Sequence, residues 1–423
     1  MRMMVAPLAA RDFRRYYVGQ TASAFGDALT PLAIAFAVLD LTGSPVDLGI
    51  VVLSTRLPVI LLTLLGGAAG DRFSRRTVML LADMTRFAAH GVTAVLLLTG
   101  TASVWMLVVL QLLAGAGSAF FNPAAVGLVV SLAGRERLQA ANSLISISRS
   151  TASMLALGTA GALVALAGSG WAIAVDALTF LVSAAYLYRL PSDLPAAPVA
   201  GRVRDGGRLL ASVRGGFAEV RGRSWLWVWT VHAAVTNLAV VSPILVLGPY
   251  VADRQLGGAP AWSAIGIAYA AGGLAGGLLG ARWRPARPMA AAILLFLLMA
   301  PFPALLALPA GVWVLALAAG AAGLQLVVYN VLQTTCIQHR LPERFVARAT
   351  SVTMLGGLVA APLGMALAGP AAALLGTRPV LGGCAAVAVL LTAATLLMPA
   401  VWRVRAEHAA HAADADPVRE PTE

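Results

Sequence analysis

The stretch GAAGDRFSRR, residues 67–76, joins the apolar run LGIVVLSTRLPVILLTLLG at 48–66 to the apolar run VMLLADMTRFAAHGVTAVLLL at 78–98. It contains one acid and three arginines, although only 11% of the 423 residues are charged. A helix that crosses the hydrocarbon core of a bilayer needs about 20 apolar residues. Each flanking run is long enough to cross, so the charged stretch is predicted to connect two membrane spans.

The composition extends this prediction to the whole chain. It is 59% hydrophobic with a mean hydropathy of +0.84, whereas a soluble domain carries about 25% charged residues. Only helices satisfy all backbone groups of an open chain in lipid. We therefore expect an all-α, polytopic membrane protein with 12 transmembrane helices, placed near 16–40, 48–69, 77–99, 103–132, 139–167, 171–189, 224–250, 262–281, 288–308, 310–337, 346–370 and 379–401.

The net charge of +12 is distributed unevenly over the connections. The arginines concentrate in the even-numbered connections, and cytoplasmic loops are the ones that retain positive charge. We therefore expect a multi-pass protein of the inner (cytoplasmic) membrane with both termini in the cytoplasm. The basic residues are not gathered on a soluble surface that could bind nucleic acid, so no nucleic-acid partner is expected. The expected surroundings of the helices are membrane lipids.

The long polar break after the sixth span divides the chain into equal halves. The expected domains are a six-helix bundle at 1–190, a cytoplasmic linker at 191–223, a second six-helix bundle at 224–402 and a disordered cytoplasmic tail at 403–423. GLLGARWRPA at 277–286 repeats the glycines and the arginine of GAAGDRFSRR at the matching place. In a parallel repeat of this kind, the binding site lies between the two halves near the middle of the membrane. We also expect the protein to be a monomer.

GAAGDRFSRR resembles the signature loop of the major facilitator superfamily, with Ser74 where glycine is usual. The segments FFNPA at 120–124 and ANSL at 141–144 resemble the enterobactin exporter-like and macrolide-efflux-like branch. The resemblance implies a cytoplasmic gate motif in which Asp71 locks the halves together near Arg348 and the arginines hold the loop. The alternative is that the arginines only set topology. The gate motif comprises Gly67, Gly70, Asp71, Arg72, Arg75 and Arg76.

Polar residues at one depth in the first half predict the wall of a cavity. Charges inside a membrane are costly unless they are paired or hydrated. At the helical rise of about 1.5 Å per residue, four of them fall in one layer. The layer comprises Asp27, Arg56, Asn122 and Arg149. Asp27 is expected to pair with Arg56 or Arg149 and to couple proton movement; the alternative is a purely structural ion pair.

Other polar residues in the spans have less defined roles. Asp83 and Arg86 are expected to form a snorkelling support pair near the inner end of the third helix. The role of Asp176 is open. His90 and His232 are either titrating groups or, as is more usual for a lone histidine in a membrane, hydrogen-bonded packing residues. In the second half, Asn237 and Asn330 offer polar groups without charge.

These features favour a secondary active transporter that exports a small amphipathic organic molecule, drug-like or siderophore-like, by alternating access and proton coupling. An importer of the same fold and a non-transporting receptor stay as alternatives. No phosphate-binding loop, catalytic cluster or metal-ligand spacing is present in the sequence, so no enzyme activity, cofactor or metal is expected. The two cysteines, Cys336 and Cys384, lie in apolar segments.

The predicted topology has a direct test. A single cysteine placed within residues 201–208 should react with a membrane-impermeant maleimide only in everted vesicles, because the arginine-rich connections are predicted to stay in the cytoplasm. Labelling of intact cells would contradict the topology.

Overall fold

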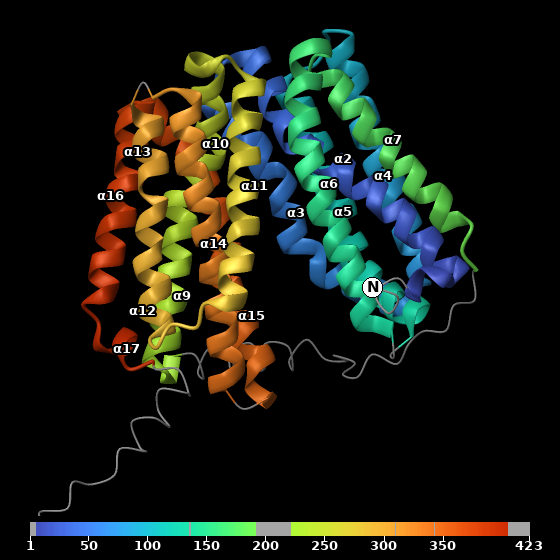
Figure 1. Cartoon of the computed structure of the whole chain (residues 1–423). Helices are drawn as coiled ribbons and strands as arrows, with labels where there is room; N and C mark the ends of the chain where they lie inside the picture. The colour runs from blue at the N-terminus through green and yellow to red at the C-terminus, as the bar shows by residue number, and fades with distance from the viewer. Residues whose placement is uncertain (1–5, 135–136, 192–220, 309, 342, 405–423) are drawn as a thin grey trace, which may run out of the picture. The chain divides into compact units, whose positions relative to one another are not determined.

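The computed structural model describes residues 6–134, 137–191, 221–308, 310–341 and 343–404. Within these ranges the regular structure is entirely helical, and Figure 1 shows long helices lying side by side in each part of the chain. The all-α prediction is confirmed.

The first half consists of a short 3-10 turn, η1 (Ala6–Ala9), and six long helices. They are α2 (Arg11–Thr42), α3 (Pro45–Arg72), α4 (Arg75–Leu98), α5 (Val104–Ala133), α6 (Leu138–Ala167) and α7 (Ser169–Tyr188). The sequence sets the breaks between them. Gly43 has a φ of 61° and ends α2, and the Ser44 side chain then accepts from the Asp47 N–H to begin α3. Left-handed glycines and N-capping serines are the usual signals for these two positions.

The second half continues with helices interrupted by local changes of winding. In chain order they are α9 (Ser224–Thr236), η3 (Asn237–Val241), α10 (Ser242–Val251), η4 (Ala252–Leu256), α11 (Ala259–Arg282), α12 (Pro288–Leu295), η5 (Phe296–Met299), α13 (Pro301–Ala307), α14 (Val312–Arg340), α15 (Glu343–Leu375), α16 (Thr377–Leu396) and α17 (Pro399–Trp402). The segments η3 and η4 are π-helical turns inside one continuous rod, 224–256, which runs past the predicted end at 250.

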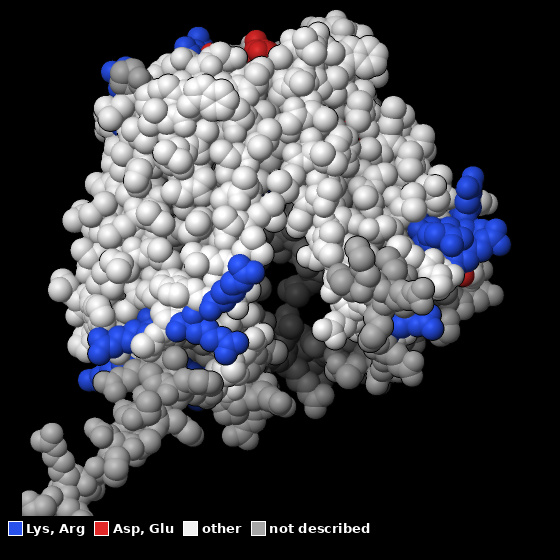
Figure 2. Space-filling view, viewed as in Figure 1, with Lys and Arg blue, Asp and Glu red and all other residues white. Residues whose placement is uncertain are grey.

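Eleven helices among the described residues are long and apolar enough to cross a membrane, and α15 adds a shorter apolar stretch, Val359–Leu375. Arginine side chains gather near helix ends, and Figure 2 shows the middle of the visible face free of charge. The chain is therefore a multi-pass membrane protein, as its composition predicts.

The chain forms two compact units. The first contains Met1–Arg202 together with Leu245–Ile267 and Pro362–Thr377; the second contains Val203–Ile244, Ala268–Ala361 and Arg378–Glu423. In the first unit, Arg254 donates to the Gly43 carbonyl oxygen at 3.3 Å, and a Cβ on Gly49 would meet the Met365 carbonyl oxygen at 2.9 Å. The predicted bundles at 1–190 and 224–402 stay a prediction, as do the linker and the tail, most of which lie outside the described residues.

The repeated glycine motif packs in the same way in each half. Gly70 of α3 faces Ala124 of α5, with 3.8 Å from a built Cβ to the Ala124 Cβ, and Gly280 of α11 faces Val331 of α14, with 3.2 Å to the nearest Val331 methyl. In both halves, therefore, this glycine is the point at which the second helix contacts the fourth helix. Small residues let helix backbones approach closely in membranes.

Gly26 brings α2 directly against α7. A Cβ at this position would collide with the carboxylate of Asp176 and the hydroxyl of Thr179. The absence of a side chain at Gly26 therefore leaves room for a buried carboxylate between the two helices. Gly91 on α4 offers a matched control, because nothing lies within 4 Å of a Cβ built there.

Gly26→Val should destabilise the protein by roughly 1–3 kcal/mol, the usual cost of overpacking, whereas Gly91→Val should change little. The measurement is the thermal aggregation midpoint of the two purified variants in the same detergent. Equal midpoints would show that the α2–α7 contact tolerates a side chain at position 26.

Candidate functional site

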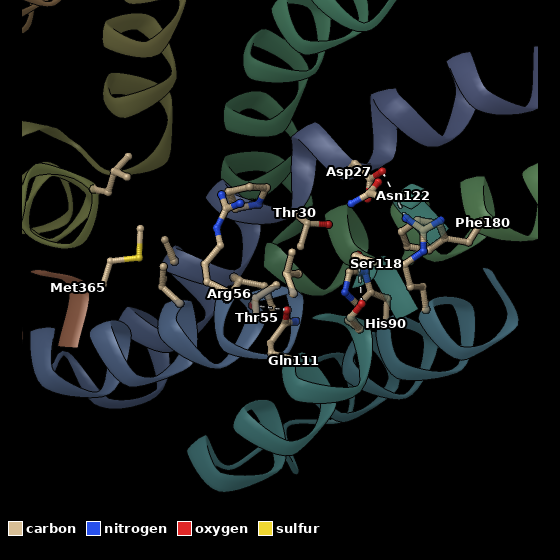
Figure 3. A pocket seen from close by; sticks show the side chains of 18 residues that line it. Asp27, Thr30, Thr55, Arg56, His90, Gln111, Ser118, Asn122, Phe180 and Met365 are labelled. Atoms are coloured by element: carbon tan, nitrogen blue, oxygen red, sulfur yellow. Dashed lines mark hydrogen bonds and ion pairs between the residues drawn. The ribbon is translucent and has the colours of Figure 1, made fainter. Parts of the chain in front are cut away.

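A cavity of about 370 Å³ lies in the first unit, lined mainly by α2, α3, α4 and α5. Its polar lining residues include three of the predicted layer, Asp27, Arg56 and Asn122. Apolar side chains such as Ile34, Val52 and Phe180 complete the wall. Figure 3 shows the labelled polar side chains converging on this space. The cavity matches the usual pattern of small-molecule sites, which are apolar with a few placed polar groups.

Arg86 is the centre of the charged part of the site. Its guanidinium is 4% exposed and forms ion pairs with Asp83 on its own helix and, at 3.5 Å between Nη1 and Oδ2, with Asp27 of α2. The rings of Phe121 and Phe180 lie 4.3 and 4.2 Å from the guanidinium carbon. Two carboxylates and two aromatic faces together make a buried arginine tolerable in a membrane.

Hydrogen bonds continue from Arg86 to α7 and back to α2. The Ser183 hydroxyl donates to Asp83 Oδ2 at 2.7 Å, and Gln20 Nε2 donates to the Ser183 hydroxyl at 3.1 Å. Asp83 and Ser183 are fully buried. The chain of polar contacts therefore ties three helices together at one depth.

A second buried carboxylate, Asp176 of α7, lies nearby and pairs with a histidine. His90 Nδ1 lies 2.5 Å from Asp176 Oδ2, and the Thr30 hydroxyl donates to the same oxygen at 2.5 Å. Asp176 is 0% exposed. His90 and Thr30 also line the cavity, so this pair is part of the same site.

Arg56 stands apart from this cluster. Its side chain is exposed to the cavity, and none of the acids that the structure describes forms an ion pair with it. In Figure 3 it lies away from Asp27 and toward Met365. The neighbouring Thr55 hydroxyl donates to Gln111 Oε1 at 3.0 Å. Arg56 thus offers a positive charge that a bound molecule can neutralise.

Two expectations about pairing are wrong. Asp27 pairs with Arg86 rather than with Arg56 or Arg149, because α2 and α4 both pack against α7. Arg149 is exposed on α6 and does not line the cavity. The Asp83 and Arg86 pair exists, but it is buried rather than snorkelling: Arg86 lies about eleven residues, or about 16 Å, from the start of α4 at Arg75.

His90 is hydrogen-bonded, as expected, but the sequence did not predict that its partner is Asp176, although a partial signal existed. Asp83, Arg86 and His90 follow one another at spacings of three and four and share the buried face of α4 with Met79 and Ala82. Residues at these spacings lie on one side of a helix. Polar groups on a buried stripe must find partners on another helix.

Two arginines of the gate motif donate to backbone carbonyls, Arg75 to one within α5 and Arg76 to two at the C-terminal end of α7. Arg75 Nη1 donates to the Gly127 carbonyl of α5 at 2.8 Å, and Arg76 donates to the carbonyls of Leu187 and Tyr188 at 3.0 and 2.5 Å. Cationic groups at the C-terminal ends of helices satisfy unpaired carbonyls and interact favourably with the helix dipole. Arg75 and Arg76 thus connect the start of α4 to α5 and α7, and their role in a gate stays a prediction.

The other motif residues have fewer described contacts. Arg72 is exposed beside the Phe73 ring, with 5.8 Å to the ring centre, and nothing lies within 4 Å of a Cβ built on Gly67. The side chains of Asp71 and Arg348 lie outside the described residues, so the latch stays a prediction. In the second unit, Asn237 Nδ2 donates to the Ala233 carbonyl at 2.9 Å and Asn330 is exposed; their place in a substrate site also stays a prediction.

Comparison with known proteins identifies the class. The family model of the Major Facilitator Superfamily matches residues 16–365. The chain therefore belongs to this superfamily of membrane transporters and is not grouped with enzymes.

Individual relatives point in the same direction. The chain is 32% identical to the uncharacterized MFS-type transporter YfiS of Bacillus subtilis, over 41% of each chain. It is 29% identical to the multidrug efflux pump Tap of Mycolicibacterium fortuitum, over 82% of this chain and 86% of that protein, and 24% identical to the macrolide efflux protein A of Streptococcus pyogenes, over 84% and 88%. The crystal structure of the nucleoside transporter NupG matches with a TM-score of 0.73 at 14% identity, covering 93% of this chain and 99% of that one, which confirms the fold.

Arg86→Gln should lower the stability of the folded protein by about 3–5 kcal/mol, because it leaves buried Asp83 without its counter-charge. Arg56→Gln should have a small effect, since it breaks no ion pair among the described residues. The measurement is the thermal midpoint of purified protein in detergent. The double variant Asp83→Asn/Arg86→Gln should recover part of the loss, and equal effects of the two arginine substitutions would contradict this account.

Proposed function

We propose that this chain is a proton-driven exporter of a small amphipathic organic molecule in the cytoplasmic membrane, with both termini inside, working by alternating access. The cavity of the first unit supports this most directly, because an ionisable cluster around Asp27 and an unpaired Arg56 share its wall. Apolar lining with two separated charged regions suits an amphipathic organic molecule better than a bare ion.

The direction of transport is proposed from the relatives. Two proteins that match more than four fifths of this chain are named as efflux pumps, one for multiple drugs and one for macrolides. The structural neighbours are too distant in sequence to add information on direction or substrate. Export of an organic molecule is the function that these names and the cavity support together.

The charge of the substrate follows from Arg56. Arg86 is balanced by Asp27 and Asp83, which leaves Arg56, among the described residues that line the cavity, as the cation available to a ligand. We propose that the substrate carries an acidic or catechol group that Arg56 binds through charge-assisted hydrogen bonds. Everted vesicles from cells that make the protein should then accumulate anilinonaphthalene sulfonate, an amphipathic anion, in preference to ethidium, a cation. Uptake without a proton gradient, or no uptake above the vector control, would count against driven export.

Asp27→Asn should abolish gradient-driven accumulation in proteoliposomes and leave passive exchange of the same probe. The reason is that Asp27 is the half-exposed acid of the cluster, with 51% of its side chain accessible from the cavity, so it can exchange protons with water there. The measurement is the ratio of driven to passive transport.

Asp12→Asn is the matched control, because Asp12 lies at the start of the same helix and pairs only with nearby Arg15 among the described residues. It should keep the ratio of the parent. An unchanged ratio in Asp27→Asn would remove Asp27 from the coupling mechanism.

A further inference from the structure

We propose that His90 and Asp176 form a second proton-binding site, separate from Asp27, so that the cluster exchanges two protons in each transport cycle. This inference rests on the proposed proton-driven function and adds its second carrier. The observation behind it is a buried histidine–carboxylate pair at the wall of the cavity, in which one imidazole nitrogen has no hydrogen-bond partner in the part of the chain that the structure describes.

The hydrogen bonds around Asp176 fit an ionised carboxylate. Oδ2 accepts from the Thr30 hydroxyl and from His90 Nδ1, each at 2.5 Å, and the Thr179 hydroxyl lies 3.4 Å from Oδ1. The Thr30 hydroxyl donates to Oδ2 and His90 Nδ1–H can donate to it, whereas the Thr179 hydroxyl donates to the Asp176 backbone carbonyl at 2.7 Å. With Nδ1–H bound to the carboxylate, a neutral His90 leaves Nε2 as the atom that accepts a further proton.

His90 Nε2 is buried and has no hydrogen-bond partner among the described residues. A buried polar atom without a partner costs free energy. A proton bound at Nε2 forms one N–H bond there and converts the pair into an imidazolium and a carboxylate, with no net charge. Loss of that proton to the cavity leaves a single negative charge at a fully buried position, which is unfavourable in a membrane.

The charged groups around His90 and Asp176 do not cancel the negative charge that the pair carries when His90 is neutral. Asp83, Arg86 and His90 of α4 and Asp176 of α7 all act electrostatically on Asp27 of α2. Arg56 of α3 lies across the cavity without an ion pair among the described residues, and α5 contributes uncharged Gln111 and Asn122. Three carboxylates thus face one arginine in the immediate cluster.

This count determines the number of protons. Arg86 balances one carboxylate, so two negative charges stay when His90 and all three acids are deprotonated. One proton on His90 and one on a carboxylate bring the cluster to neutrality. Asp27 is the half-exposed acid, while Asp83 and Asp176 are fully buried. His90 and Asp27 line the cavity, and Asp83 and Asp176 are not among its lining residues, so we assign the two protons to His90 and Asp27.

The second half offers a matched histidine for comparison. His232 is also buried, and its Nδ1 lies 3.2 Å from the Tyr329 hydroxyl. Its ring packs against Phe296 and Tyr329, and it has no carboxylate partner among the described residues. His232 thus shares the burial of His90 and lacks the acid that would stabilise a positive charge.

Proton binding can be tested without a substrate. Purified full-length protein with isotope-labelled histidine, in lipid nanodiscs, is titrated between about pH 5 and 9 and followed by NMR, across the range where histidine normally titrates. The signal that is missing from the His90→Gln variant is assigned to His90. In the parent protein this signal should change from imidazolium to neutral imidazole as the pH rises. In the Asp176→Asn variant it should stay neutral throughout. The signal lost in His232→Gln should stay neutral in the parent. A His90 signal that never becomes imidazolium would overturn the inference and leave the proposed export intact.

Transport gives an independent second readout if Asp176→Asn does not fold. The number of protons moved per molecule of anilinonaphthalene sulfonate should fall two-fold in His90→Gln proteoliposomes and stay unchanged in His232→Gln. Glutamine retains an amide N–H that can donate to Asp176. An unchanged proton ratio in His90→Gln would overturn the second site, whereas a parent protein that moves no protons would instead overturn the proposed function.

Discussion

A charged side chain inside a membrane must have partners, and Arg86 meets this requirement through its contacts with three helices. Asp83 on its own helix, Asp27 on α2 and the rings of Phe121 and Phe180 on α5 and α7 surround the guanidinium. Because each partner comes from a different part of the first unit, Arg86 fixes the depth at which these helices meet. The cavity, the half-exposed Asp27 and the buried His90 all lie next to this point.

Within this arrangement, some charged side chains hold the helices together, and others face the cavity, where a proton or a substrate can reach them. Asp83 is fully buried and holds Arg86 and Ser183, so its role is to position neighbouring groups. Asp27 shares Arg86 but remains accessible from the cavity, and Arg56 faces the cavity without an acid partner among the described residues. A proton or a substrate anion can therefore change the balance of charge at Asp27 and Arg56 while the contacts of Asp83 persist.

The sequence predicts the helices well because the length and apolarity of a span are local properties. The charged connection between the second and third spans follows from the same local reasoning, although the structure extends both helices into it and leaves only Phe73 and Ser74 between them. The partner of Asp27 does not, because ion pairs depend on which helices become neighbours, and neither hydropathy nor depth along one helix determines that. Arg86 also lies deeper than expected, because α4 begins at Arg75 and carries this residue well into the membrane. Asp176 has no partner within its own helix, so only the packing of α7 against α2 and α4 reveals its role.

The central claim is that proton movement is linked to substrate movement at this cluster. It is tested most directly in proteoliposomes that contain a pH-sensitive dye and start without a pH gradient. Addition of anilinonaphthalene sulfonate to one side should drive protons in the opposite direction and create a pH gradient as the probe crosses, because an exchange carrier can be run by either gradient. Movement of the probe with no change of internal pH would contradict the account.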